Sequence, residues 1–205
     1  MTVRILFLGL ILSTAVAFAQ DRIFFSRTFP GSAPEYFEVT VDESGAAQYR
    51  EAPDEEPLEF TVDEAAKQEL FDAAGRLDRF SKDIASKRKV AFTGDKVLRY
   101  EPAEGAPSEA RFSYTEDETA RQLVDWFHRA SETERLLIEL ERVERFDRLG
   151  VNDALLALQS SYDRGRVVAP EQFLPILQKI VEQDRILHLA RSRAAGLIER
   201  IEAAE

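Results

Sequence analysis

The feature that most constrains the fold of this chain is a strand–strand–strand–helix order that occurs twice between residues 36 and 130. In the first copy, alternating apolar and polar side chains predict three half-buried strands, at 36–42, 46–51 and 58–62, before a helix at 63–77. The second copy predicts strands at 90–93, 96–101 and 111–115, again before a helix. Alternating strands joined by short turns indicate antiparallel pairing, with helices packed on one face of the sheet.

The two copies also match at individual positions. The aligned pairs include Val39 with Val90, Tyr49 with Tyr100 and Pro53 with Pro102, at offsets that range from 49 to 54 residues and require small insertions. In the second copy, Gly94-Asp95 predicts a two-residue hairpin turn between the strands at 90–93 and 96–101.

We therefore expect an α+β fold for residues 20–130: an antiparallel sheet of six or seven strands, built from a duplicated β-β-β-α unit with helices on one face. The stretch 22–28 would be the additional strand. The Phe, Val and Tyr faces of the strands are expected to form the core, because apolar strand faces usually pack on helices. An aromatic ligand-binding slot is the alternative interpretation of the same faces.

Three capping-box motifs predict where helices begin. In this motif a Ser or Thr caps the first turn and a Glu three residues later binds back to the cap. The motifs are Thr61 with Glu64, Thr115 with Glu118, and Ser131 with Glu134. The third motif predicts a new helix that runs from Ser131 to Leu149.

Residues 131–205 show no strand pattern and are expected to form a helical region. Helices are predicted up to Leu149, at 152–164, from Pro170 to about 182, and at 184–202, the last with an apolar stripe that includes Leu187. The region repeats itself at an offset of 37 residues. The matched pairs include Leu137 with Leu174, Leu140 with Leu177, Val143 with Ile180 and Leu149 with Ile186.

This spacing resembles HEAT-type helical-hairpin repeats over residues 133–203, most clearly in the copy that opens with Leu174-Pro175-Ile176-Leu177. The resemblance implies a surface that binds a protein partner, and it implies no catalytic residues. A plain helical bundle packed on the sheet is the alternative.

Charges on the first of these helices predict which of its sides faces solvent. Glu141 with Arg145 and Glu144 with Arg148 have the favourable spacing for ion pairs along one helix. Both pairs are therefore expected on a solvent-facing side.

The first 19 residues have the pattern of a cleavable signal peptide. Arg4 precedes an apolar run over 5–12, and Ala17-Phe18-Ala19 forms a small-residue cleavage site. The alternative is an uncleaved anchor, but Ile5 to Ala19 is only 15 residues long, short of the roughly 20 that span a bilayer. We predict cleavage after Ala19, a secreted or periplasmic protein, and no integral membrane segment after cleavage.

Composition excludes several classes of chemistry. The chain has no cysteine, which excludes disulfides, thiolate nucleophiles and cysteine metal sites. It has 27 basic and 38 acidic residues, so no nucleic acid partner is expected. Phosphate-binding glycine loops and the serine-hydrolase elbow are absent from the sequence, and no cofactor is predicted.

A few side chains could still carry chemistry. Asp125 with His128 and Asp184 with His188 could each give a metal two ligands, but a carboxylate–imidazole hydrogen bond on the helix surface, which needs no third partner, is favoured for both pairs. Trp126, beside His128, is expected in the core.

Two charged clusters each have two interpretations. The Asp54-Glu55-Glu56 cluster could attract calcium, but a solvated turn is favoured. The Lys87-Arg88-Lys89 cluster is expected to form ion pairs or to shield a strand end. We assign no catalytic, cofactor-binding or metal-binding residue.

The sequence thus predicts an exported, non-enzymatic protein that binds a protein partner through its helical region. One alternative is a hydrolase with a carboxylate and histidine site. The other is a protein that binds a small ligand or peptide on the open face of the sheet. The sequence does not indicate an oligomeric state.

Overall fold

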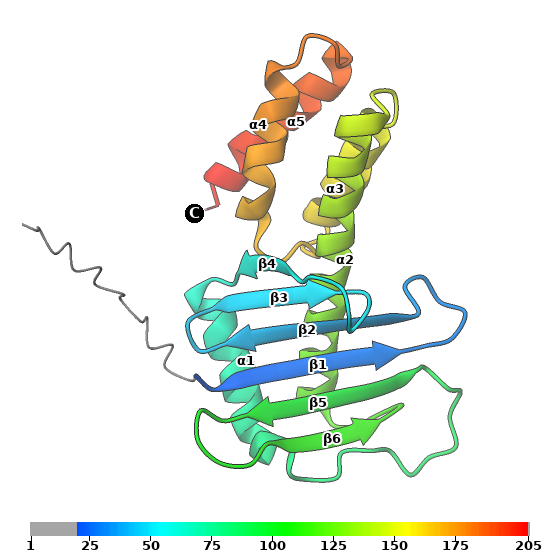
Figure 1. The fold of residues 1–205 in the computed structure, drawn as a ribbon, viewed down its shortest axis with the longest axis vertical. Coiled ribbons are helices and arrows are strands. Elements are labelled where there is room, and N and C mark those ends of the chain that lie inside the picture. Colours follow the sequence, from blue (N-terminus) through cyan, green and yellow to red (C-terminus); the bar gives the residue numbers. More distant parts are fainter. Residues whose placement is uncertain (1–19, 205) are drawn as a thin grey trace, which may run out of the picture.

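The computed structural model describes residues 20–204, which form an α+β fold of one six-stranded antiparallel sheet and five α-helices (Figure 1). The predicted fold class is therefore confirmed, including the C-terminal helical region. The predicted signal peptide, residues 1–19, lies outside the described residues. Within the described part of the chain, no helix is both long and apolar enough to cross a membrane.

Each of the six strands is antiparallel to its neighbours in the sheet. They are β1 (Arg22–Thr28), β2 (Tyr36–Asp42), β3 (Ala46–Arg50), β4 (Leu58–Thr61), β5 (Asp95–Glu101) and β6 (Ser108–Phe112). Across the sheet their order is β4-β3-β2-β1-β5-β6, so β1 and β2 lie at the centre. Five of these strands match predicted ones within one residue at each end, and β6 begins and ends three residues earlier than predicted.

Two helices cover one face of the sheet. They are α1 (Glu64–Arg76) and the N-terminal half of α2 (Glu118–Phe146), which lie behind the strands in Figure 1. Ile23, Phe25, Val39 and Leu98 point toward these helices and are fully buried. The apolar strand faces therefore form the core, as predicted. Trp126 also belongs to this core and is 7% exposed.

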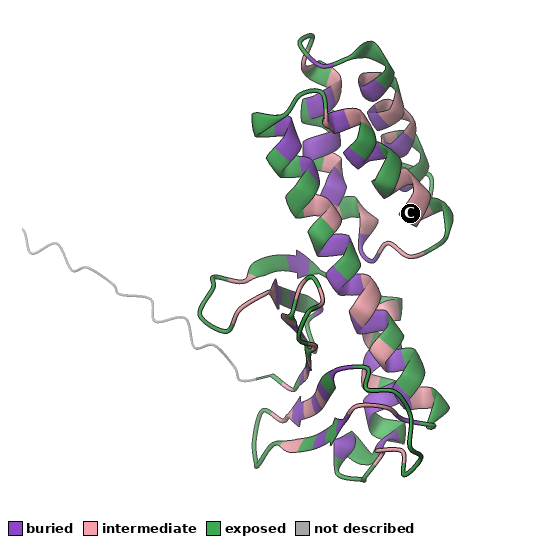
Figure 2. Ribbon diagram, turned by 90° about the vertical axis from the view of Figure 1, so that its right-hand side faces the viewer, coloured by how far each residue is buried: buried purple, intermediate pink, exposed green. Residues whose placement is uncertain are grey.

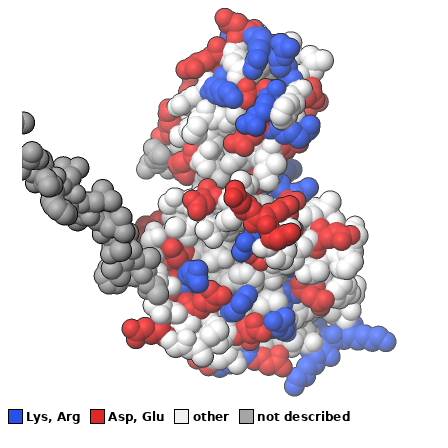
Figure 3. Space-filling model, in the orientation of Figure 1, with Lys and Arg blue, Asp and Glu red and all other residues white. Residues whose placement is uncertain are grey.

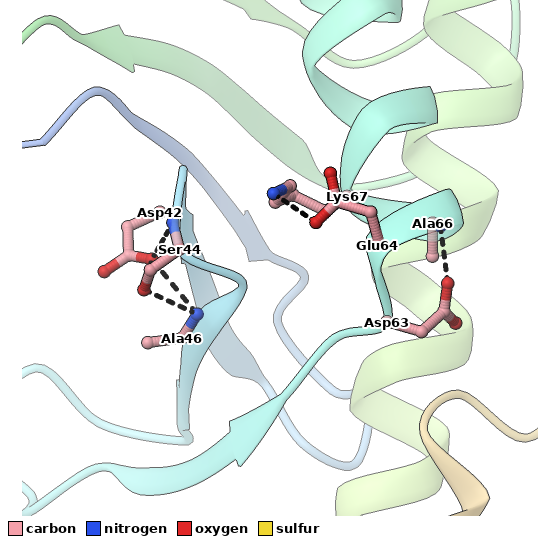
Figure 4. A network of polar contacts seen from close by, with 7 residues as sticks. All are labelled: Asp42, Ser44, Ala46, Asp63, Glu64, Ala66 and Lys67. Carbon is pink, nitrogen blue, oxygen red and sulfur yellow. Dashed lines mark hydrogen bonds and ion pairs between the residues drawn. The ribbon is translucent and has the colours of Figure 1, made fainter.

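Local polar contacts hold the turn between β2 and β3 and the start of α1 (Figure 4). The Asp42 carboxylate accepts hydrogen bonds from the backbone amides of Ser44, at 2.8 Å, and Ala46, at 3.0 Å. Gly45 has a φ of +86°, and a Cβ there would lie 2.7 Å from the carbonyl oxygen of Val62. Only glycine fits this turn without strain.

Aspartates, and not the predicted threonines, cap the two helices on the sheet. Asp63 accepts from the Ala66 amide at 2.8 Å in Figure 4, and Asp117 accepts from the Ala120 amide at 2.9 Å. A carboxylate at this position also favours the positive end of the helix dipole. The first two helix starts were thus predicted within about two residues, but the capping residue was wrong.

The predicted strand at 90–93 does not form, and Gly94-Asp95 is not a hairpin turn. Val90 is 46% exposed whereas Val39 is fully buried, so these two residues are not equivalent. β1 occupies the position beside β5 that was predicted for a strand at 90–93. Ile23 lies opposite Tyr100 in the sheet just as Val39 lies opposite Tyr49, which makes Ile23 the counterpart of Val39. The second half of the sheet takes its inner strand from the beginning of the described chain.

The helix predicted to begin at Ser131 is also wrong, because α2 runs without a break for 29 residues. Ser131 and Glu134 lie in the middle of α2 and are buried, at 4% and 1% exposure. The first half of α2 packs on the sheet, and the second half packs in the helical region (Figure 2).

The helical region consists of two hairpins. It contains the second half of α2, α3 (Val151–Asp163), the 3₁₀ segment η2 (Pro170–Phe173), α4 (Leu174–Glu182) and α5 (His188–Glu202). The second half of α2 pairs with α3 and α4 pairs with α5, while α3 also contacts α5. The helix at 184–202 was predicted to start four residues too early. The match of Leu149 with Ile186 fails, since Leu149 is 76% exposed and Ile186 only 2%.

Candidate functional site

The structure separates the two histidines that the sequence singled out. The His128 ring lies against the rings of Phe37 and Phe25, with centroids 5.5 and 5.9 Å away. Burial and the positive charges of Arg27 and Lys96 lower the pKa of His128 to about 4. Its neighbour Asp125 pairs with Arg129 at 3.1 Å. His128 is therefore a neutral ring in the sheet core at neutral pH.

The second histidine lies at the start of α5. His188 is exposed, and its Nδ1 lies 3.5 Å from the hydroxyl of Ser192. Asp184 pairs with Arg191 at 2.8 Å. Among residues 20–204, no group of three or more His, Asp or Glu side chains is placed to hold a metal ion.

The two charged clusters lie in exposed loops. Asp54-Glu55-Glu56 forms the solvated loop between β3 and β4, as favoured from the sequence. In the basic cluster, Arg88 pairs with Glu116 at 2.9 Å, which agrees with the expected ion pairing.

The uncovered face of the sheet is polar. Figure 3 shows Lys and Arg side chains interspersed with Asp and Glu over this face. The charges bind one another: Glu38 pairs with Arg50, and Glu101 lies 3.0 Å from Arg22. Phe24 at its centre is covered by the guanidinium of Arg99, 4.2 Å from the ring centroid.

In the helical region, a buried carboxylate joins the ends of the two hairpins. Glu144, in the last turn of α2, is 2% exposed and accepts a hydrogen bond from Lys179 at 2.6 Å and another from Gln183 at 2.5 Å. Arg185 adds an ion pair at 3.6 Å. Burial would raise the pKa of Glu144, but its hydrogen bonds and these cations lower it overall. Glu144 thus binds α4 and the α4–α5 turn, and not Arg148 as its spacing predicted.

Because Glu144 ties them together, the α2–α3 turn and the α4–α5 turn lie side by side, at the end of the molecule farthest from the sheet (Figure 1). Four large apolar side chains at these turns are exposed. They are Phe146 at 75%, Leu149 at 76%, Leu187 at 52% and Leu189 at 61%, and we call them the hairpin tip. Single exposed apolar residues are common on proteins, so it is the grouping of four at one end of the molecule that makes the hairpin tip a candidate interaction surface.

The sequence patterns do not single out the hairpin tip. They place Leu187 in the apolar stripe of the last helix and match Leu149 with a buried residue. The available signal was local: Phe146 and Leu149 stand among the charged residues Arg145, Asp147 and Arg148, just before Gly150, a residue that marks a break between helices. Apolar residues at such a turn have no helical face left to pack on.

Comparison with known proteins gives this chain no family. No protein-family model matches the sequence, no curated protein matches it, and no solved structure matches the fold.

Proposed function

We propose that this chain is an exported, non-enzymatic protein that binds another protein through the hairpin tip. The observation that supports this function is the exposure of four large apolar side chains at two turns held together by Glu144. The buried core between the helices holds both turns in place, so the side chains of the hairpin tip have a fixed arrangement. Such pre-organisation reduces the entropy lost on binding.

The charges near the tip favour a protein over a lipid surface. A basic cluster of four to eight Lys or Arg residues would indicate binding to an anionic membrane. Here the signs alternate instead, in Arg145, Asp147 and Arg148 on one turn and in Asp184 and Arg185 on the other. An apolar centre with a mixed polar rim is typical of protein interfaces.

Photo-crosslinking in the native cell tests this proposal. A photoreactive residue at position 149 should give a discrete crosslinked product with one partner. The matched control is position 156, because Leu156 is also an exposed leucine, at 49%, but lies on α3 outside the two turns. The same products from both positions would contradict the proposal, and a product of twice the chain mass would replace the separate partner with a second copy.

A surface variant then tests the contribution of the tip to affinity. Replacing Phe146, Leu149, Leu187 and Leu189 together by serine should leave the melting temperature nearly unchanged, because these side chains are already exposed. Affinity for the identified partner should fall by about a hundredfold, as expected when several apolar interface anchors are lost. Unchanged affinity would contradict the proposal.

Export is part of the same proposal and rests on the pattern of residues 1–19. N-terminal sequencing of the protein from the envelope or medium should begin at Gln20. A protein that retains its first 19 residues in the cytoplasm would contradict this part. The hydrolase alternative gains no support from either histidine, since His128 contacts aromatic rings and His188 is exposed at the start of α5.

A further inference from the structure

A pocket of about 490 Å³ lies between the first half of α2 and the end of the sheet where β1 finishes and β5 begins. This end of the sheet is on the right in Figure 1 and faces the viewer in Figure 2. The pocket is on the helix-covered side of the sheet, at the opposite half of α2 from the hairpin tip. Its volume is within the range of sites that bind small molecules.

Two cations from neighbouring strands line this pocket. Arg27 of β1 and Lys96 of β5 lie directly opposite each other in the sheet, and both are at core-facing positions, two residues from Phe25 and Leu98. Lys96 is only 7% exposed, and Arg27 is half-buried. Like charges directly opposite on neighbouring strands destabilise a sheet. Folding alone therefore gives no reason for this pair.

Neither cation has a counter-ion in the described part of the chain. No carboxylate of residues 20–204 lies within 4.0 Å of either group, although most cations of the protein that are not exposed have such a partner. The Lys96 ammonium donates hydrogen bonds to neutral oxygens, chiefly the carbonyl oxygens of Thr93, at 2.9 Å, and Ser113, at 2.7 Å. These contacts hold the ammonium in place without neutralising it.

The Arg27 guanidinium is less constrained. Among the described residues it makes no hydrogen bond, and it lies over the ring of Phe29, 5.1 Å from the centroid. Burial lowers its pKa, as expected for a charge that has left water without gaining a partner. Its fork of donors matches the geometry of a carboxylate or a phosphate.

The remaining charges near the pocket are already paired. Asp125, its one carboxylate, binds Arg129 at 3.1 Å and lies 3.8 Å from Arg166. Arg121 pairs with Glu118. In a chain with a net charge of -11, this pocket is locally positive. The other part of its lining is largely apolar, with Phe29, Phe112, Tyr114 and Val124.

We infer that this pocket binds an amphipathic organic anion, with the anionic group between Arg27 and Lys96 and an aliphatic or aromatic body against the apolar lining. The anion would separate the two like charges and satisfy the free guanidinium. This ligand site is independent of the hairpin tip, because the two lie in different regions of the fold.

Calorimetric titration of the mature chain with octanoate tests the inference, with octanamide as the neutral isostere and acetate as the head group alone. Octanoate should bind at least about tenfold more tightly than either control, since it alone supplies both the charge and the apolar body. Chemical shifts on binding should change at Thr93, Ser113 and Thr115 around the pocket. Equal binding of octanoate and octanamide, or no binding of octanoate, would overturn the inference.

The variant R27Q separates a ligand site from a structural role. It should weaken octanoate binding about tenfold or more and should raise the melting temperature of the free protein, because it removes a like-charge pair. R193Q is the matched control, since Arg193 is also half-buried without a carboxylate partner but lies on α5. R193Q should leave octanoate binding unchanged.

A second variant, V124W, tests the volume of the pocket and leaves both cations in place. It should abolish octanoate binding by filling the space beside the apolar lining.

A protein in which R27Q lowers the melting temperature and leaves octanoate affinity unchanged would show that Arg27 is structural, and the inference would be wrong.

Discussion

α2 buries two glutamates, one near its middle and one in its last turn, and the pKa values of their carboxyl groups shift in opposite directions. Glu134, where the sheet meets the helical region, is 1% exposed, and neither carboxyl oxygen has a hydrogen-bond partner in the described residues. Burial raises its pKa to about 7, and the amide of Gln172 opposes this rise without reversing it. Glu144, ten residues further along α2, is 2% exposed but lies closer to the protein surface, where Lys179, Gln183 and Arg185 bind it, and its pKa is lowered. The opposite shifts follow from the deeper burial of Glu134 and from the cationic partners that Glu144 has.

The two glutamates have different roles in packing. At the hairpin end, three donors surround the Glu144 carboxylate in place of water, and these contacts fix the position of α4 against α2. At the junction, Thr133 already accepts the amide of Val168 at 3.0 Å and so anchors the loop before η2. Glu134 is then left facing Gln172, whose own side-chain oxygen also lacks a donor. A protonated Glu134 can supply that donor, so the neutral acid suits this site best.

The largest effect is expected from E134Q. Above pH 7 the buried carboxylate is charged, and the difference between its pKa of about 7 and the ordinary glutamate pKa of 4.5 corresponds to roughly 3 kcal/mol of lost stability. E134Q should therefore raise the free energy of unfolding at pH 8.5 by roughly 3 kcal/mol, and by little at pH 4. Urea denaturation at the two pH values measures this.

The matched control for E134Q is E141Q, because Glu141 is exposed on the same helix and has no ion pair in the described structure. E141Q should change stability little at either pH. An equal gain from E134Q at pH 4 and pH 8.5 would show that Glu134 is not protonated in the folded state near neutral pH.

The second effect has the opposite sign. E144Q removes a carboxylate whose pKa is lowered on folding, so stability should fall fully above the unfolded pKa of about 4.5, and this loss should shrink below that pH and vanish as pH falls through the lower folded pKa. We expect about 2 kcal/mol at pH 7, because hydrogen bonds to a charged group are lost while Lys179 and Arg185 stay half in water.

Hydrogen exchange shows where the E144Q effect is localised. Amides of α4 and the α4–α5 turn should exchange faster in E144Q, while those of β1 and β2 at the centre of the sheet keep their protection. Faster exchange in the sheet as well would show that the two halves of α2 unfold as one unit.

Sequence patterns predicted most of the elements because each depends on local periodicity. The alternation of Phe37, Val39 and Val41 is enough to indicate β2, and the spacing of Ala190, Ala194 and Leu197 is enough for α5. The strand at 90–93 failed for a non-local reason. Which strand lies beside β5 depends on pairing across the sheet, and β1 occupies that place with Ile23 opposite Tyr100.

The candidate sites depended even more on tertiary contacts. Ser131 and Glu134 have the spacing of a capping box, but the apolar face that contains Phe127 and Ala130 continues α2 straight through them. Likewise, nothing local links Arg27 with Lys96, which are 69 positions apart and meet only through the pairing of β1 with β5. Neither a buried acid nor a like-charge pair can be recognised before the sheet is assembled.

The smallest effect concerns His128 in the sheet half of α2. Its folded pKa of about 4 lies below the ordinary histidine pKa of 6.5, so its contribution to stability is present above pH 6.5 and is lost as pH falls toward 4. The contribution of Glu134 to stability has the opposite dependence on pH and increases as pH falls from 7 to 4.5.

The wild-type protein should therefore show little change in stability over this range, whereas E134Q should lose stability as pH falls from 7 to 5. Adding H128Q to E134Q should reduce that loss by about 1 kcal/mol, because the histidine ring is partly exposed and its full shift is not realised. If the E134Q protein is as stable at pH 5 as at pH 7, the ring of His128 is not held neutral by the sheet core.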